Sequence, residues 1–577
     1  MKVRNLKIVL SFLFIVVAIG LFKLQVVNYG YYSSLSKENR IRINPIIASR
    51  GDIYDRDGNI LAKSRLSFNL AVIPDEAMKN ENLLSDLSLV VGMSEKILQS
   101  NLKRNTINYF VPAIIAEDIP REQALYIEEN NLNYEGAFIQ TAPLREYLYE
   151  ESLAHVLGYV SKLTAGEYKK LKFYGYKSID LVGRTGIESS YNSYLKGEDG
   201  GFQIEVDNRG RHLRLIGYKK PQKGKDIYTS IDLDLQNYIY SLIENKKGAV
   251  CVMNPNDGKI LAMVSVPSYN PNIFINPNAQ KNKEIRVIFD TSPNNTPLLN
   301  RSIQAVYPCG SVFKIVTLIS GLETGAINRS SEFNCPGFLM LGKRKFKCWY
   351  RKGHGNQNVI LALKNSCNVF CYKVGLKVGI DNLSDYSRKF GFGAITGIDL
   401  PSEQAGLVPD RHWKRKIYND RWYDGDTVSL AIGQSYLQVT PLQILRMASV
   451  IANGGYLVTP SLVNRIEDID VGVGKVESCN FKIDNLDAIS EGMDLVVSET
   501  GTGKRAQVKG INIAGKTATI QNSQGKTHAG FICFFPYDVP MYAIVVFIEH
   551  GGSGGYEAAG IAQKIISYMK DEDIIKQ

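Results

Sequence analysis

The sequence predicts an α+β protein attached to a membrane by one N-terminal helix. Three observations predict this class: a single long apolar segment near the start, short β-like runs alternating with turns up to about residue 225, and strand patterns at both ends of the remaining chain. At 577 residues the chain is too long for one hydrophobic core, because single cores stop growing at roughly 250–300 residues. We therefore expect two or three domains.

The first element is the apolar segment of residues 8–27, whose length nearly matches one bilayer crossing. Lys2, Arg4 and Lys7 precede it, so the positive-inside rule predicts that residues 1–7 are cytoplasmic and that everything after the segment is exported. No small-x-small cleavage site follows, which favours an uncleaved transmembrane anchor over a cleaved signal peptide.

The second element is residues 28–225, where short β-like runs alternate with turns and polar helical patches. The tripeptide Asp57-Gly58-Asn59 is a tight-turn signal between two strands. Residues 204–210 have the pattern of a strand that ends in a turn. Because no nucleophile stands beside a base in this region, we interpret it as an extended, mixed α/β support module that serves structure and partner contact.

The third element is residues 226–577. A helix-like segment over 229–242 precedes a hairpin pattern over 248–264, and the far end has an apolar strand over 542–548 and an amphipathic helix over 558–569. Strands from the two sequence ends can pair in one antiparallel sheet with helices packed against it. This arrangement predicts an α+β domain around a long helical middle.

Composition excludes several classes of protein. With 44% apolar and 22% charged residues, the chain has the composition of an ordinary globular protein rather than a disordered or collagen-like one. Its net charge is +11, but we interpret the basic and acidic residues as interleaved along the chain, without the clustered basic stripe of nucleic-acid binders. No nucleic-acid partner is expected.

The residues with the clearest chemistry are Ser311-Val312-Phe313-Lys314, where a hydroxyl and an amine lie one helical turn apart. Ser34 and Ser523 also begin a Ser-x-x-Lys pattern, and we attach no function to either. Only Ser311 follows Gly310 and leads an apolar helix, whose positive N-terminus stabilises developing negative charge. Taken alone, Ser311 is also consistent with a helix cap.

Two further patterns follow in order, Ser366-Cys367-Asn368 and Lys516-Thr517-Ala518-Thr519. Together the three patterns resemble the set of the penicillin-binding proteins and class A β-lactamases. The chain resembles specifically the class B penicillin-binding proteins of the elongation type, similar to penicillin-binding protein 2. Further stretches carry this likeness, which covers nearly the whole chain: 300–314, 433–443, 528–531 and 549–552.

The resemblance implies a peptidoglycan D,D-transpeptidase with a penicillin-binding, serine β-lactamase-like fold over 226–577 and a pedestal or dimerisation-type module over 28–225. It implies an acyl-enzyme at Ser311 and covalent inhibition by β-lactams. The implied roles of the site residues are these: Lys314 as base, Ser366 as proton relay, Asn368 as a contact of the donor amide, Lys516, Thr517 and Thr519 as binders of the terminal carboxylate, and the backbone N–H groups of Ser311 and Thr519 as the oxyanion hole.

One residue departs from the family pattern, because Ala518 stands where the family has Gly. We expect its methyl group to narrow the substrate slot and to slow acylation or lower β-lactam affinity. Four alternatives stay open: a D,D-carboxypeptidase, a β-lactamase, a division-type transpeptidase, and an inactive scaffold that regulates a partner glycosyltransferase. No supporting carboxylate loop for a β-lactamase is recognisable.

A possible metal site is formed by Cys335, Cys348, His354 and Cys367. Three thiolates and one imidazole make a closed tetrahedral zinc set, and the resemblance also implies zinc at this place. Because Cys367 lies between Ser366 and Asn368, the metal would have a structural role in positioning that motif. A disulfide or free thiols is the alternative.

No second catalytic domain is recognisable in the sequence, so glycan polymerisation must come from another protein. The resemblance implies a SEDS-type glycosyltransferase of the RodA kind and other elongation proteins as partners. It also implies a single-pass protein of the inner membrane with a periplasmic catalytic domain.

Overall fold

The computed structural model describes residues 2–32, 41–106, 109, 111–177, 180–206, 212–275, 279–289, 296–472, 474–521 and 525–575. The chain folds into two compact units. The first unit consists of Met1–Gly51, Ser64–Leu144 and Lys196–Gly224, and the second of Asp52–Lys63, Arg145–Leu195 and Lys225–Gln577. The domain boundary expected between residues 225 and 226 stays a prediction, although the second unit does resume at Lys225.

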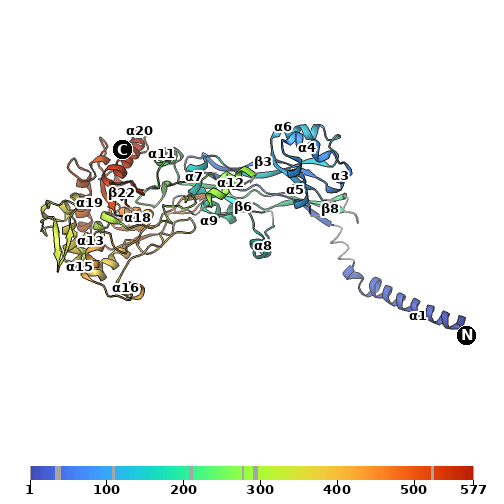
Figure 1. Ribbon diagram of the computed structural model, residues 1–577, viewed down its shortest axis with the longest axis horizontal. Coiled ribbons are helices and arrows are strands. Elements are labelled where there is room, and N and C mark those ends of the chain that lie inside the picture. Colours follow the sequence, from blue (N-terminus) through green and yellow to red (C-terminus); the bar gives the residue numbers. More distant parts are fainter. Residues whose placement is uncertain are drawn as a thin grey trace. The chain divides into compact units, whose positions relative to one another are not determined.

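The N-terminal helix α1 (Lys2–Phe22) continues as a π-helical turn, Lys23–Val27. Over Asn5–Val27 it has a mean hydropathy of 2.4 and is long and apolar enough to cross a membrane. It is the one such helix in the described part of the chain, and it is the blue helix that ends at N in Figure 1. A single membrane span is therefore supported.

The remainder of the first unit is built from antiparallel strands and short helices. Strands β1, β8 and β9 form one sheet in the order β1-β8-β9, and β3 pairs with both β4 and β5. Helices α4, α5 and α6 bury their apolar faces against β3 and β4. The elements are β1 (Ile41–Ile46), β3 (Ile60–Val72), α3 (Pro74–Lys79), α4 (Leu83–Val91), α5 (Glu95–Asn105), β4 (Ala113–Ile119), α6 (Arg121–Glu129), β5 (Ala137–Tyr147), β8 (Gly200–Val206) and β9 (His212–Lys219).

Two local expectations concern turns. The turn at Asp57-Gly58-Asn59 is confirmed, because it joins β2 (Ile53–Tyr54) to β3 as an antiparallel pair. The carboxylate of Asp55 fixes it by accepting from the backbone N–H of Asp57 at 2.9 Å and of Asn59 at 2.7 Å. The strand expected at 204–210 is confirmed as β8, and the turn that should follow lies outside the described residues.

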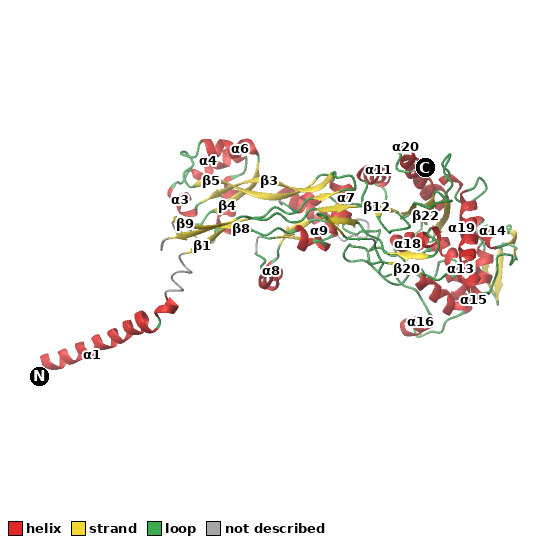
Figure 2. Ribbon diagram, turned by 180° about the vertical axis from the view of Figure 1, so that it is seen from behind, coloured by secondary structure: helices red, strands yellow, loops and turns green. Residues whose placement is uncertain are grey.

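The core of the second unit is a five-stranded antiparallel sheet in the order β12-β11-β23-β22-β21. Figure 2 shows this sheet among red helices. Strand β11 pairs with β23 from Gly248 opposite Ile548 to Met253 opposite Ala543, so strands from the two sequence ends do meet as expected. The strands are β11 (Gly248–Met253), β12 (Ile260–Val266), β21 (Ala514–Ile520), β22 (His528–Phe535) and β23 (Tyr542–Ile548).

Helices cover both faces of this sheet. On one face α11 (Leu233–Ile243) and α20 (Ala559–Asp571) bury apolar side chains against alternate residues of the strands. Helix α18 (Pro441–Ala452) packs on the other face and is buried throughout. It begins with a capping box, in which the Thr440 hydroxyl accepts from the Gln443 N–H and the Gln443 side chain accepts from the Thr440 N–H, with Pro441 in the first turn.

The other elements of the second unit surround this layer. A second sheet runs in the order β19-β18-β10-β2-β3. The remaining bounds are α7 (Glu150–Leu157), β6 (Val160–Lys162), α8 (Ala165–Leu171), β7 (Leu181–Gly183), α9 (Gly186–Ser190), α10 (Asn192–Leu195), β10 (Ile227–Thr229), α12 (Ala279–Ile288), α13 (Lys314–Glu323), β13 (Phe333–Cys335), β14 (Phe338–Leu341), β15 (Arg344–Lys347), β16 (Gly355–Gln357), α14 (Val359–Lys364), α15 (Asn368–Lys389), α16 (Arg411–Tyr418), α17 (Asp424–Leu430), β17 (Tyr456–Val458), β18 (Val463–Ile466), β19 (Ile469–Asp470), β20 (Val476–Ser478) and α19 (Ile483–Val497).

Candidate active site

Ser311 lies in the tight 3-10 turn Gly310–Phe313, which runs directly into α13. Gly310 has φ +60° and donates its N–H to the carbonyl of Gly433 at 2.8 Å. A Cβ atom at Gly310 would lie 2.6 Å from Cγ1 of Ile520, so only Gly lets this turn approach strand β21 so closely. Ser311 therefore stands beside the edge strand of the sheet. The Ser-x-x-Lys patterns at Ser34 and Ser523 begin outside the described residues.

Lys314 is fully buried at the start of α13. Its Nζ donates to the carbonyl of Ser366 and to Oδ1 of Asn368, both at 2.6 Å, and lies 3.0 Å from the Ser366 hydroxyl. A neutral amine has two N–H donors and one lone pair. The two short bonds match the donors, and a neighbouring hydroxyl can donate to the lone pair. The arrangement therefore suits Lys314 as a free base.

Lys516, on β21, also reaches the Ser366 hydroxyl. Its Nζ lies 3.0 Å from Oγ of Ser366 and donates to its neighbour's carbonyl, that of Thr517, at 3.2 Å. Burial lowers the pKa of Lys516 well below 10.5, and the proximity of the Lys314 amine adds to this shift, because the two neighbouring amines do not easily hold a proton each. Burial likewise lowers the pKa of Lys314 from 10.5. The Ser366 hydroxyl thus lies 3.0 Å from both buried amines, so a proton can pass between them through this hydroxyl.

Ser366 has a left-handed backbone, with φ +49°, in the turn between α14 and α15. Non-Gly residues rarely hold this conformation unless other groups fix it. Here the carbonyl of Ser366 accepts from Lys314 Nζ and, at 3.1 Å, from Nε1 of Trp349. Trp349 also donates to the carbonyl of Asn365 at 2.9 Å. This role of Trp349 was not predicted from the sequence. The only sequence signal for it is that Trp349 directly follows Cys348.

The side chains of β21 alternate between the two faces of the strand. Lys516 and Ala518 share one face, and Thr517 and Thr519 share the other. Thr517 is buried and donates to the hydroxyl of Thr502 at 3.3 Å, whereas the exposed Thr519 accepts from the N–H of Gly554 at 3.2 Å. The structure thus brings Lys516 to Ser366 and gives both threonine hydroxyls partners within the protein.

The methyl group of Ala518 is buried, with 1% of the residue exposed. A Cβ atom built at Gly530 would lie 3.2 Å from it, and one built at Gly310 would lie 3.6 Å from it. The methyl therefore packs between two glycines, one of which precedes the nucleophile. It fills the space between these glycines, next to the turn that holds Ser311. The expected narrowing of the substrate slot stays a prediction.

A second set of polar groups fixes the chain just before Ser311. The hydroxyl of Tyr307 donates to Oε1 of Glu549 at 2.6 Å, and Arg301 Nε donates to the same oxygen at 2.9 Å. Burial favours a higher pKa for Glu549, but these two partners outweigh it and lower that pKa. His528 lies close by, its ring 5.8 Å from that of Tyr307. These residues anchor the nucleophile segment to the end of β23.

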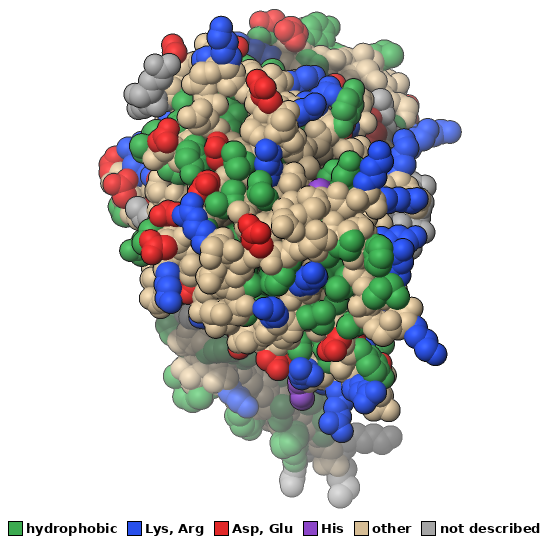
Figure 3. All heavy atoms as spheres, turned by 90° about the vertical axis from the view of Figure 1, so that its left-hand side faces the viewer, with side chains coloured by type: hydrophobic (Ala, Val, Ile, Leu, Met, Phe, Trp, Pro, Cys, Tyr) green, Lys and Arg blue, Asp and Glu red, His purple; other side chains and the backbone are tan. Residues whose placement is uncertain are grey.

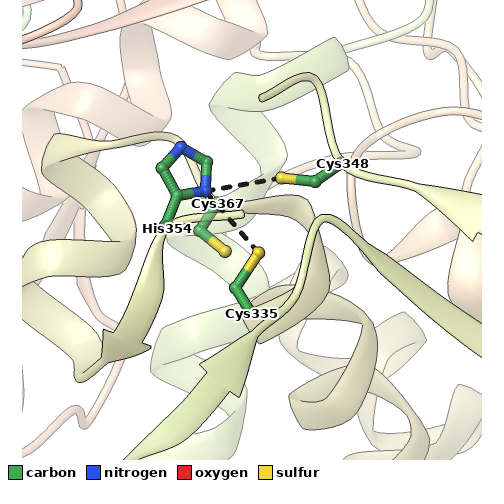
Figure 4. A group of neighbouring side chains, drawn as sticks. All are labelled: Cys335, Cys348, His354 and Cys367. Atoms are coloured by element: carbon green, nitrogen blue, oxygen red, sulfur yellow. Dashed lines mark hydrogen bonds between the residues drawn. The ribbon is translucent and has the colours of Figure 1, made fainter. Parts of the chain in front are cut away.

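Cys335, Cys348, His354 and Cys367 come together from four loops and strand ends. Their donor atoms all lie within 4.8 Å of one another, and Figure 4 shows the sulfurs of Cys335 and Cys348 turned toward the His354 ring. Nδ1 of His354 lies 3.7 Å from the sulfur of Cys335 and 3.5 Å from that of Cys348. Donors around a tetrahedral zinc ion lie about 3.5–3.8 Å apart, given bonds of ~2.3 Å to sulfur and ~2.0–2.1 Å to nitrogen. The two distances from His354 therefore have the values expected around zinc, and the donor types suit it.

The thiols also differ in acidity. Hydrogen bonding from Cys367 lowers the pKa of the Cys348 thiol, which favours the thiolate, the form that binds metals. All eight cysteines are free of disulfides in the structure. Four outside the cluster, Cys251, Cys309, Cys371 and Cys533, are fully buried, and Cys479 is nearly so.

Two parts of the chain match known protein families. The chain matches the family described as the Penicillin binding protein transpeptidase domain over residues 248–567, and the Penicillin-binding Protein dimerisation domain over residues 45–229. It is 32% identical to the Peptidoglycan D,D-transpeptidase MrdA of Haemophilus influenzae, over 96% of this chain and 89% of that relative.

Two solved structures are similar over most of the chain. One is penicillin-binding protein 2 of Helicobacter pylori in a complex with MreC, with a TM-score of 0.82 and 32% identity over 93% of this chain and 100% of that chain. The other belongs to a peptidoglycan synthase complex that coordinates polymerization and crosslinking, with a TM-score of 0.74 and 28% identity over 98% of each chain.

Proposed function

This chain belongs to the penicillin-binding protein transpeptidase family, and from that premise we propose that Ser311 is the nucleophile of its reaction. The protein is a serine-type peptidoglycan D,D-transpeptidase, which cross-links stem peptides. The observation that carries the assignment of Ser311 is the convergence of Lys314 and Lys516 on the Ser366 hydroxyl, next to the turn that holds Ser311.

Acylation is the first step. Oγ of Ser311 attacks the carbonyl carbon of the penultimate D-Ala of a donor stem, and Lys314 as free base takes the hydroxyl proton. The C–N bond to the last D-Ala then breaks, and its nitrogen takes a proton through the Ser366 hydroxyl, which lies 3.0 Å from both lysines. The products are free D-Ala and an ester at Ser311.

The developing oxyanion is stabilised by two backbone N–H groups, those of Ser311 and Thr519. One such donor contributes roughly 3–4 kcal/mol of transition-state stabilisation. Strand β21 is an edge strand within the described sheet, so an extended donor stem can pair with its backbone. Asn368 contacts the donor amide, and Lys516, Thr517 and Thr519 bind the terminal carboxylate. Because the Thr517 hydroxyl is buried, Thr517 contributes the least of the three to binding this carboxylate.

Deacylation completes the reaction. The amine of a second stem attacks the ester carbon, the bond to Oγ of Ser311 breaks, and the amine proton passes to Lys314 and back to Ser311. Attack by water instead would make the protein a D,D-carboxypeptidase. An assay of the purified chain with a donor stem and an amine acceptor decides between them: we expect the cross-linked dimer to exceed the hydrolysed tetrapeptide, and a product mixture without dimer would overturn the proposal.

We propose that Cys335, Cys348, His354 and Cys367 hold one structural zinc ion. When bound, zinc would supply a closed cross-link between these four side chains and no part of the acyl-transfer chemistry. The loop that it ties together carries Trp349, whose indole N–H holds the Ser366 carbonyl. The bound zinc ion would therefore hold Ser366 and Asn368 in a fixed position.

The apolar helix α1 supports attachment of the protein to a membrane. We propose a single-pass protein of the inner membrane with a cytoplasmic N-terminus and a periplasmic catalytic unit. One similar structure is a complex with MreC and another is a peptidoglycan synthase complex. On this basis the partners are a SEDS-type, RodA-like glycosyltransferase and other proteins of cell-wall elongation, and the substrate is peptidoglycan that the glycosyltransferase polymerises.

Ala518→Gly is expected to lower the free energy of unfolding by about 1–2 kcal/mol, because a buried methyl group is lost and Gly is less favourable in a strand. Acylation by penicillin should change less than about threefold, because the methyl packs between Gly310 and Gly530. A methyl group that lined the substrate pocket would instead shift the barrier by ~1–3 kcal/mol, which is about tenfold or more. Denaturant unfolding and the rate of adduct formation measure the two effects. A tenfold gain in acylation would instead support a methyl that narrows the substrate slot.

A further inference from the structure

A cationic hairpin stands next to the Ser366 turn. Residues 333–380 contain nine Lys and Arg residues and no Asp or Glu, so the interleaving of charges expected along the chain is wrong for this segment. Six of the nine lie within residues 343–352, and all six are exposed: Lys343, Arg344, Lys345, Lys347, Arg351 and Lys352. We call residues 338–352 the cationic hairpin.

The hairpin is an ordered structure formed by β14 and β15, the yellow-green strands near α15 in Figure 1. Aromatic rings hold two of its charges in place: Lys345 Nζ lies 3.9 Å from the centre of the Phe338 ring and Arg344 Cζ lies 4.9 Å from that of Phe346. Figure 3 looks onto this end of the second unit, where Lys and Arg side chains project into solvent. None of the six exposed cations forms an ion pair with a described residue.

Acidic groups of the neighbouring α17 do not neutralise the hairpin. The ring of Phe346 lies against Gly425, because a Cβ atom there would be 3.6 Å from it. Of the two carboxylates that flank this glycine, Asp426 already accepts from Lys414 at 2.6 Å. Asp424 is exposed. One carboxylate beside six cations leaves this surface strongly positive.

The base of the hairpin is bonded to the catalytic groups. Nδ2 of Asn368 lies 3.4 Å from the carbonyl of Lys347, and the hydroxyl of Tyr372 donates to that carbonyl at 3.2 Å. Trp349 donates to the carbonyl of Ser366, yet 56% of Trp349 and 41% of Tyr350 are exposed. A ligand on the hairpin would therefore touch two open rings and would lie next to Ser366.

The reaction needs two peptides at one ester. In the proposed function the donor stem pairs with the edge of β21, and we place the second stem on the side of Ser311 where Ser366, Asn368 and the hairpin lie. That second stem is acidic, because its own terminal D-Ala carries a free carboxylate. We propose that the cationic hairpin binds the carboxylates of the acceptor stem and directs its amine to the Ser311 ester. This proposal deepens the proposed function and rests on it.

The hairpin has no covalent role. It acts by Coulomb attraction, which concentrates and orients an anionic partner and weakens as salt screens it. Acylation of Ser311 by penicillin needs no acceptor, so it should not depend on the hairpin. Attack by the acceptor amine should depend on both the hairpin charges and the acceptor carboxylates.

The test compares two triple variants of the full chain in detergent. Lys343→Gln/Arg344→Gln/Lys345→Gln removes three hairpin charges, and the control Lys169→Gln/Lys170→Gln/Lys172→Gln removes three exposed charges around the end of α8. Each is assayed for penicillin acylation, for binding of a fluorescent acceptor stem, and for cross-linking of a donor stem to that acceptor. A second acceptor has its carboxylates amidated.

For the hairpin variant we expect about tenfold weaker binding and about tenfold slower cross-linking of the acidic acceptor at low salt. This is the effect of losing three exposed ion pairs between the hairpin and the acceptor. The amidated acceptor and penicillin acylation should change less than about twofold, as should every readout of the control. Equal losses with both acceptors, or wild-type binding by the hairpin variant, would overturn the proposal. So would loss of binding to anionic lipid vesicles with unchanged cross-linking, which would make the hairpin a membrane contact.

The outcome also separates this proposal from the function on which it rests. If the wild-type chain binds the acidic acceptor through the hairpin but releases only hydrolysed donor, then the transpeptidase assignment fails and the acceptor site stands. If cross-links form and hairpin charges have no effect on them, the acceptor site fails and the transpeptidase assignment stands.

Discussion

Lys314→Met is expected to slow the acylation of Ser311 by about 10²–10⁴-fold, the usual contribution of a general base. The amine of Lys314 is the only base in the described site that shares a helical turn with Ser311, and methionine fills the same buried space without a proton acceptor. The fold should survive, because the Ser366 carbonyl that loses the Lys314 amine still accepts from the indole N–H of Trp349. The rate of penicillin adduct formation measures the effect, and Lys564→Met, an exposed change on α20, is the control.

The pH dependence gives an independent readout of the same base. Burial lowers the pKa of Lys314 below 10.5, so the free base forms, and acylation accelerates, as pH rises through this lowered value. The free energy of unfolding changes with pH in the same direction as the acylation rate. Between the lowered pKa and 10.5 the unfolded chain binds more protons than the folded one, so the free energy of unfolding increases with pH in that window. A flat acylation profile from neutral to alkaline pH would contradict the role of Lys314.

Loss of the metal site is the second large effect. Cys348→Ser should leave the purified chain with less than one zinc ion and lower its unfolding free energy by several kcal/mol, since binding of a structural zinc contributes directly to folding. Acylation should also slow, because the cluster loop carries the Trp349 bond to Ser366. Elemental analysis, thermal unfolding and adduct formation measure the three effects.

The control for that experiment is Cys479→Ser, which alters a buried cysteine outside the cluster. It should keep the metal content of the wild type. A wild-type chain without zinc, or a Cys335–Cys348 disulfide found by mass spectrometry, would overturn the zinc proposal.

Much of the second unit could be predicted from local pattern. The apolar runs at Gly248–Met253 and Tyr542–Ile548 have strand length, and pairing them in one covered sheet buries both, so their pairing is favoured by the hydrophobic effect. The spacing of Ser311 and Lys314 likewise predicts one shared helix face. These features depend on neighbours in sequence or on burial alone.

Other features depend on contacts that a sequence does not display. The methyl group of Ala518 meets glycines at positions 310 and 530, and only the packed structure shows this. Trp349 reaches the Ser366 carbonyl across 17 residues. The segment Arg145–Leu195 packs with the second unit, although it lies within the support module of the sequence. Strand alternation, by contrast, could have separated Thr517 and Thr519 from Lys516 beforehand.

The most direct test of the Ser311 acyl-enzyme is the intact mass of the chain after incubation with a fluorescent penicillin, for the wild type and for Ser311→Ala. If Ser311 forms the acyl-enzyme, we expect one adduct per wild-type chain and none on the variant, with both proteins folded. An adduct that persists on Ser311→Ala would place the nucleophile elsewhere. A folded wild-type chain that takes no adduct would contradict the acyl-enzyme itself.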